Sequence, residues 1–376
     1  MGYSQAQLNA KLEAKVQDYV DQRRKSFMVI LQALSERTIE DMVVPPQFLT
    51  FEGNARLHAL VNENGTEHDF ALTPHSAQQV ANRLGLPVGW VRKSVDSGND
   101  YHTMSVAYAL NKYVQNVERR DERLLFRNVN GVTRGILSTS YKRLNTKEIF
   151  TAFLEQAQTM GLVLLDAHEG YARDYLEVID PAIRWVETPN NGKFGYCRGF
   201  QLKNSDFGDG SLMGRSLNLQ AVCCNGLIGN RYLKEVHLGK RMGDEHIFSI
   251  ETINLETELR ARKVRETMQY VFNPINTEIE EAQILDASGH VIDIQPEVER
   301  LPKIGFTVDE SKAVGAVLMN NDKNDGVEGK PTLWKLAQAV GRIARDAEPE
   351  RSRTLMELAG DMVFKPNEKL TSVEIE

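Results

Sequence analysis

The dipeptide Asn130-Gly131 constrains the fold more than any other feature of the chain, because it lies between two short β-rich runs. Asparagine followed by glycine best tolerates the positive φ angles of a two-residue hairpin turn. Residues 124–137 are therefore predicted to form a β-hairpin. Basic and aromatic side chains lie on this hairpin or close behind it: Arg127, Arg134, Tyr141, Lys142 and Arg143. Such a hairpin could hold a phosphate backbone, and it is equally compatible with an ordinary solvated sheet edge.

Apolar residues at three- and four-residue spacing predict helices elsewhere in the chain. One helix is expected over residues 3–37, and Thr73-Pro74 opens a pair of short helices separated by Gly85 and Pro87. Further helices are predicted at 105–120, 146–160, 246–285 and 331–346, and strands at 48–71 and 162–219. The pattern predicts an α+β fold with a central, mostly antiparallel sheet, hairpins, and helical N-terminal and C-terminal portions.

The length of 376 residues exceeds that of one typical core, so several structural units are expected. We predict four parts: an N-terminal helix (1–44), an α+β core domain (45–245), a mostly helical C-terminal region (246–365) and a frayed tail (366–376).

Composition favours a soluble, cytoplasmic protein. The apolar fraction is 41% and the charged fraction 26%, both ordinary for a globular chain. No stretch approaches the length of a membrane span, and the first residues lack the apolar core of a signal peptide. The three cysteines, Cys197, Cys223 and Cys224, form no disulfide framework, which indicates a reducing compartment.

Motifs for metals, cofactors and covalent catalysis are missing from the sequence. Adjacent Cys223 and Cys224 lack zinc-ligand spacing, so we expect them to fill a core. The glycine-rich stretch 204–214 is not followed by the Gly-Lys-Ser/Thr of a phosphate-binding loop, and its aspartates would repel phosphate. We interpret that stretch as a flexible surface turn. No cofactor, metal or catalytic residue is assigned.

The charge is distributed unevenly along the chain. The net charge is −7, yet residues 101–160 hold 9 Lys and Arg against 5 Asp and Glu, and residues 183–245 hold 9 against 6. Local fields steer charged partners, so an acidic protein can carry a positive groove. We therefore predict binding of single-stranded DNA or RNA, with cations on phosphates and aromatic rings on bases. The residues expected to carry it are Arg119, Arg120, Arg127, Arg134, Tyr141, Lys142, Arg143, Arg215, Arg231, Tyr232, Lys240 and Arg241. Assembly of several copies along a strand is compatible with this mode.

Two other functions stay open at this point. The first is an enzyme with a spatially assembled polar site, for which the candidate groups are Asp206, Asp209, His237 and His246. The second is a structural or inhibitory protein that acts through its surfaces, which a large exposed apolar patch would favour. The arginines of the hairpin region would then simply pair with neighbouring acids.

Three segments carry a resemblance to a family. Residues 124–144, the segment 210–227 with Cys224-Asn225-Gly226-Leu227 near its end, and Leu333-Trp334 with Ala339-Val340 resemble signatures of the phage/plasmid-like domain of unknown function 932. Gln338, Arg342 and Ile343 depart from the family pattern. The resemblance covers roughly residues 45–360 and implies residence on bacteriophages or plasmids. It favours a role in DNA metabolism, such as annealing or accessory work in replication or recombination, and it supplies no catalytic residue.

Overall fold

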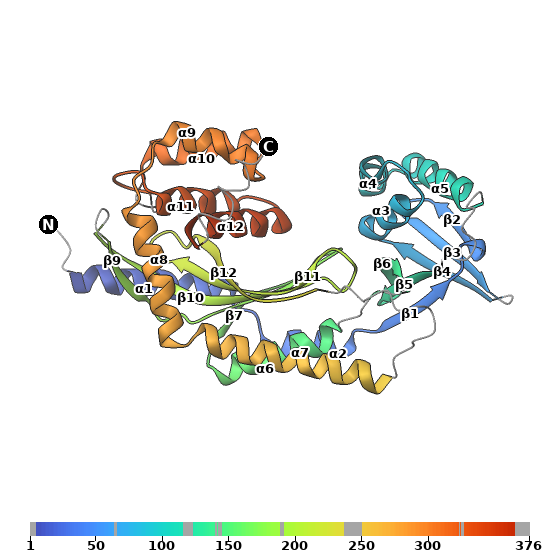
Figure 1. The fold of residues 1–376 in the computed structure, drawn as a ribbon, viewed down its shortest axis with the longest axis horizontal. Coiled ribbons are helices and arrows are strands. Elements are labelled where there is room, and N and C mark those ends of the chain that lie inside the picture. Colours follow the sequence, from blue (N-terminus) through green and yellow to red (C-terminus); the bar gives the residue numbers. More distant parts are fainter. Residues whose placement is uncertain are drawn as a thin grey trace.

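Two β-sheets lie at opposite ends of an elongated molecule (Figure 1). This computed structural model describes residues 5–63, 66–115, 123–139, 141, 145–188, 192–236, 250–322, 324 and 327–364. The predicted α+β class is confirmed, with mostly antiparallel strands and helices in both terminal portions. The strands divide between two sheets, however, rather than forming one central sheet.

The first sheet and three helices form the part that we call lobe A. Its strands lie in the order β1-β5-β6-β4-β3-β2, and only β4 and β6 run parallel to each other. The strands are β1 (Ile39–Val44), β2 (Leu49–Gly53), β3 (Leu57–Glu63), β4 (Thr66–Leu72), β5 (Leu124–Val129) and β6 (Val132–Ser138). The helices are α3 (Pro74–Arg83), α4 (Val88–Asp96) and α5 (Asp100–Gln115), and a 3-10 turn, η1 (Pro46–Phe48), precedes β2.

The predicted hairpin is present in lobe A. Strands β5 and β6 pair antiparallel, and Val129 lies opposite Val132 across the turn. Asn130 and Gly131 have φ angles of 50° and 79°, as a two-residue turn of this kind requires. The helical pair α3–α4 also lies where the sequence places it, and the Thr73 hydroxyl accepts a hydrogen bond from the Ser76 amide at the start of α3.

Helix α5 packs closely on the sheet of lobe A. Val106 and Leu110 belong to the same apolar core as Phe51 of β2. At Gly53 a side-chain Cβ would come within 2.4 Å of the backbone of Thr103 and Met104, so only glycine allows this approach. One face of α5 is thereby buried, and the opposite face points to solvent.

The second sheet and the remaining helices form lobe B. Its strands are all antiparallel in the order β12-β11-β10-β8-β7, and β9 pairs with β10. The strands are β7 (Val163–Glu169), β8 (Asp174–Ile179), β9 (Arg184–Thr188), β10 (Gly192–Asn204), β11 (Ser211–Gln220) and β12 (Gly226–Val236). The helices are α1 (Gln5–Arg23), α2 (Phe27–Glu36), α6 (Thr146–Thr159), α7 (Ile250–Val271), α8 (Pro274–Gly289), α9 (Ile294–Arg300), α10 (Val308–Asn320), α11 (Leu333–Ala344) and α12 (Pro349–Phe364), with a 3-10 turn η2 (Leu301–Ile304).

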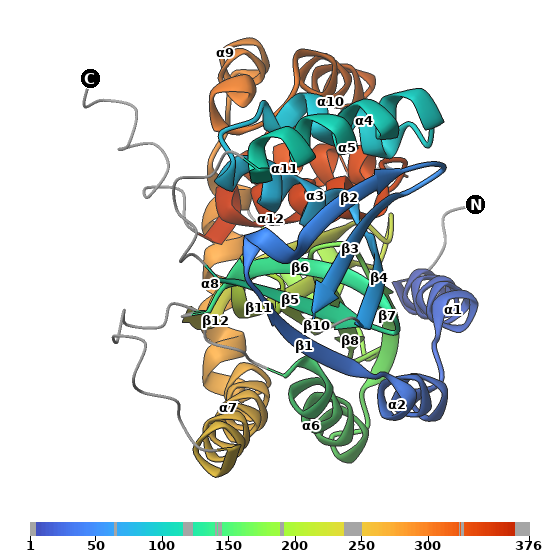
Figure 2. The ribbon, with the colours of Figure 1, turned by 90° about the vertical axis from the view of Figure 1, so that its right-hand side faces the viewer.

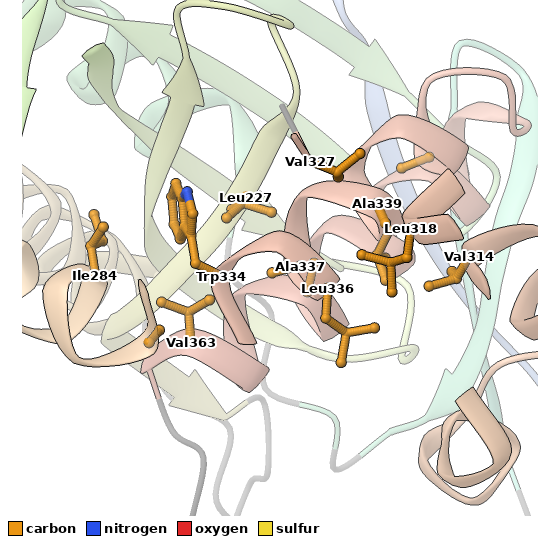
Figure 3. Close-up of a cluster of buried hydrophobic side chains, with 14 of the residues drawn as sticks. Leu227, Ile284, Val314, Leu318, Val327, Trp334, Leu336, Ala337, Ala339 and Val363 are labelled. Carbon is orange, nitrogen blue, oxygen red and sulfur yellow. The ribbon is translucent and has the colours of Figure 1, made fainter. Parts of the chain in front are cut away.

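Helices cover both faces of the lobe B sheet. Helices α6 and α7 lie on one side of it and α11 and α12 on the other (Figure 1), and the end view shows α2 beside α6 (Figure 2). The Phe153 ring of α6 stacks on Phe200 of β10 with ring centroids 6.0 Å apart. On the opposite side, Trp334 stacks on Phe194 at 5.2 Å within the apolar cluster drawn in Figure 3.

At three places the structure differs from the individual elements that the sequence predicts or adds to them. The expected single helix over 3–37 is broken at residues 24–26, where the Ser26 side chain accepts a hydrogen bond from the Val29 amide and begins α2. Helix α12 lies within the region 246–365 that was predicted to be mostly helical, but no individual helix was predicted at its position. The stretch predicted as a flexible surface turn contains Ser205, Asp206 and Phe207, which are all buried. The predicted frayed tail, 366–376, lies outside the described residues.

No helix in the described ranges is long and apolar enough to cross a membrane. The three cysteines are buried and unpaired, in agreement with the expected core role.

Candidate functional site

The arginines of the predicted hairpin lie where the two lobes meet. Arg127 is on β5 and its side chain is only 1% exposed. Its guanidinium contacts Asp41 of β1 at 3.0 Å, and it also pairs with Asp206 from the loop between β10 and β11 of lobe B. Burial lowers the pKa of Arg127, but the charges of Asp206 and Asp41 outweigh it and raise that pKa above its ordinary value. Arg127 therefore holds two carboxylates together across the lobe boundary.

Arg134 of β6 makes a second contact between the lobes. Its guanidinium donates to Asp174 of β8 at 2.8 Å, and it also contacts Glu169 and the Gly170 carbonyl of the β7–β8 connection. Arg37, between α2 and β1, donates to the same Asp174 at 3.0 Å. Both arginine side chains are 6% exposed. We call the ion pairs of Arg37, Arg127 and Arg134 the interlobe network.

The loop of residues 205–210 completes this boundary. The Phe207 ring lies under the Arg134 guanidinium at 4.0 Å, and its carbonyl accepts a hydrogen bond from the Gln79 side chain of α3 at 2.6 Å. The Tyr141 hydroxyl donates to the Ser205 carbonyl at 3.1 Å. Burial is the main cause that raises the pKa of Tyr141 above its ordinary value. These contacts explain why Ser205, Asp206 and Phe207 of this glycine-rich and acidic loop are buried.

The predicted nucleic-acid-binding residues of β11 and β12 lie away from the boundary between the lobes, and two of them contact helices of lobe B. The Arg215 side chain is 8% exposed and pairs with Asp361 of α12 at 2.5 Å. The Tyr232 hydroxyl donates to Glu280 of α8 at 2.7 Å. Of the six predicted nucleic-acid residues that lie in the described ranges, Arg231 alone is exposed.

Several predicted residues lie outside the described residues, and their positions are not assigned: Arg119, Arg120, Lys142, Arg143, Lys240, Arg241, His237 and His246. For the proposed polar catalytic site, the described members do not converge. Asp206 pairs with Arg127, whereas Asp209 pairs with Arg173 at 2.7 Å.

A different surface carries exposed aromatic side chains. On α5, Tyr101 is 80% exposed and Tyr108 is 68% exposed, and Met104 lies between them at helical spacing. The Lys112 ammonium lies 5.6 Å from the centroid of the Tyr108 ring. Trp90, on the neighbouring α4, is 41% exposed. We call these five residues the aromatic face.

The sequence of α5 contains a signal for the aromatic face. Helix α5 carries two apolar stripes: Val106 and Leu110 face the core, while Tyr101, Met104 and Tyr108 lie on the opposite side. A surface helix needs only one apolar stripe for its core contact, so a second stripe indicates a further contact surface.

Comparisons of this chain with models of protein families, with curated proteins and with solved structures find no match. The resemblance to the phage/plasmid-like family therefore stays a prediction.

Proposed function

We propose that this chain is a phage- or plasmid-type accessory protein that binds single-stranded nucleic acid, and that the aromatic face of lobe A is its contact surface. The observation that carries the proposal is the exposure of Trp90, Tyr101 and Tyr108 on two adjacent helices. Arg127, Arg134 and Arg215 are not assigned to binding, because each would have to leave a buried carboxylate partner to reach a phosphate.

Aromatic rings on a protein surface can stack on the bases of a single strand. Every base has a π-face, so this contact tolerates any sequence and contributes roughly 1–3 kcal/mol per base. Tyr101 and Tyr108 are seven residues apart and therefore lie two helical turns apart on one face of α5. Successive bases of an extended strand could thus use both rings.

The charge near the aromatic face suits a polyanion. Residues 83–112 contain four Lys and Arg (Arg83, Arg92, Lys93 and Lys112) against two aspartates, Asp96 and Asp100, in a chain whose net charge is −7. Arg92 also contacts Asp96 at 3.5 Å, but both side chains are largely exposed and such surface pairs are weak. The surplus of positive charge supports phosphate contacts beside the rings.

The direct test is fluorescence anisotropy with a labelled oligothymidylate at low salt. We expect the wild type to bind, and Tyr101→Ala and Tyr108→Ala each to weaken binding by about 5- to 150-fold, from roughly 1–3 kcal/mol per lost stack. Tyr171→Ala is the matched control, because Tyr171 is 61% exposed but lies in lobe B. Lys112→Gln should reduce the slope of log affinity against log salt by roughly 0.7 if Lys112 contacts one phosphate.

Two results would reject this surface. If the wild type does not bind at low salt, the nucleic-acid proposal is wrong and the aromatic face is better interpreted as a protein-docking surface. If both tyrosine variants bind like the wild type, the contact lies elsewhere in the chain. Circular dichroism of each variant shows whether α5 is still folded.

A further inference from the structure

Lobe B carries an exposed apolar surface with basic neighbours at the start of α2. Met28 is 69% exposed, and Val29 beside it is also exposed. Arg24 and Lys25 immediately precede this helix and are exposed as well. Residues 22–35 contain three Lys and Arg and no Asp or Glu, so the local charge is positive. We call Arg24, Lys25, Met28 and Val29 the basic patch.

A second exposed apolar surface of lobe B has acidic neighbours, where α7 ends and α8 begins. Tyr270, Ile275 and Ile279 are exposed, Ile275 by 67%. Glu278 and Asp286 are exposed too, and their helical spacing places them on the same face of α8 as the two isoleucines. Helix α8 contains four Asp and Glu and no Lys or Arg. We call these five residues the acidic patch.

The charges of the two patches have no partner within the molecule. Arg24 and Lys25 form no ion pair with any residue in the described ranges, and neither does Glu278. On the surface between the patches, by contrast, Arg265 pairs with Glu155 at 3.1 Å. Exposed apolar side chains beside unpaired charges have the composition of a protein interface, with an apolar centre and a polar rim.

The two patches lie on different sides of lobe B. In the end view, α2 lies on one side and α7 and α8 on the other, with α6 between α2 and α7 (Figure 2). The patches of one molecule therefore cannot cover each other, whereas the patches of two molecules can. Because one patch is basic and the other acidic, a pairing of unlike patches is favoured over a pairing of like ones.

We propose that the basic patch of one molecule docks on the acidic patch of a second copy of this chain, so that the molecules associate head to tail. The apolar side chains of both patches would form the centre of the contact and their charges its rim. Burial of apolar surface drives such an association, and the charges select the partner surface. A contact between unlike surfaces leaves one patch free at each end, so it extends into a ring or a filament. The contact lies in lobe B and does not use the aromatic face of lobe A.

Sedimentation velocity of the full chain at low salt, without nucleic acid, tests the proposal. We expect the average mass of the wild type to rise with protein concentration. Arg24→Glu/Lys25→Glu and Glu278→Lys/Asp286→Lys should each weaken the association about tenfold or more, because each variant places like charges opposite each other. Lys312→Glu is the matched control, since Lys312 is exposed on α10 and belongs to neither patch.

An equimolar mixture of the two charge-reversed variants gives the sharpest result. In the mixture each reversed patch meets a reversed patch of opposite sign, and each unchanged patch meets an unchanged one. We therefore expect the mixture to associate like the wild type, although each variant alone stays monomeric. Loss of folding in a variant cannot produce this recovery, and neither can a contact between two like patches.

The proposal is overturned if the wild type stays monomeric up to about 100 µM, a range that detects a micromolar Kd. It is equally overturned if the mixture does not recover association, if both charge-reversed variants associate like the wild type, or if Lys312→Glu weakens the association as much as they do. The charge-reversed variants keep the aromatic face and should bind oligothymidylate, so this proposal and the proposed function can fail separately.

Discussion

Replacing Arg127 by methionine should destabilise the protein through the interlobe network. The variant keeps a long side chain that can fill the space, but it removes the guanidinium that contacts both Asp41 and Asp206. Asp206 matters most, because its side chain is 1% exposed and cannot be solvated where it lies. Asp41 is 16% exposed and can turn part of its charge toward water.

The expected loss of stability follows from this difference in burial. Breaking a buried ion pair by removing one partner typically costs about 3–5 kcal/mol, because the remaining charge has lost its compensation. Replacing both partners by apolar residues of similar size is often neutral. We therefore expect Arg127→Met to lose about 3–5 kcal/mol, and the double variant Arg127→Met/Asp206→Leu to recover at least half of that loss.

Urea unfolding at neutral pH measures the free energy of unfolding of the single and the double variant. For Arg127→Met we expect a lower midpoint, with an unchanged slope of that free energy against urea concentration. A loss below about 1 kcal/mol for Arg127→Met would refute the reasoning, and so would a double variant that is less stable than the single one.

The same variants also test the sequence-based prediction that the hairpin binds nucleic acid. If Arg127→Met lost oligothymidylate binding while its stability was unchanged, the hairpin would be a binding surface after all.

Two further predictions concern pH and the hairpin turn. A hydrogen bond from Arg351 lowers the pKa of Glu310 from its ordinary value of 4.5 to about 2. This ion pair therefore stabilises the fold above pH ~4.5, and its contribution is lost as the pH falls toward 2. Because the pair is partly exposed, we expect Glu310→Gln to lower the free energy of unfolding by about 1 kcal/mol at pH 7 and to leave it unchanged near pH 2. Equal losses of stability at both pH values would contradict this prediction. Gly131→Val should cost about 1–2 kcal/mol in thermal or urea unfolding, because the φ of 79° at this position strains a β-branched residue. Gly89→Ala on α4, where φ is not positive and no atom lies within 4 Å of an added Cβ, is the control that should be neutral or stabilising.

Local signals in the sequence were sufficient for most of the elements. The turn at Asn130-Gly131, the start of α3 at Thr73-Pro74 and the apolar spacing of α6 each depend on residues close together in the chain, and all three were predicted. The break between α1 and α2 was missed because apolar residues continue on both sides of it, while Ser26 begins a new helix. Helix α12 was missed although its Gly360 lies directly against the Ile228 carbonyl of β12, a contact that no local pattern reveals.

The sequence by itself determined the α+β class, the hairpin, and the presence of basic residues on it, because propensity, turn chemistry and periodicity act over a few residues. Only the tertiary structure decided what those basic residues contact. Arg127 meets Asp206 from 79 positions away, and Arg134 meets Asp174 from 40 positions away. A cation on an exposed strand and a cation buried between two lobes look the same in the sequence, since the difference lies in the distant carboxylates that the fold brings to them.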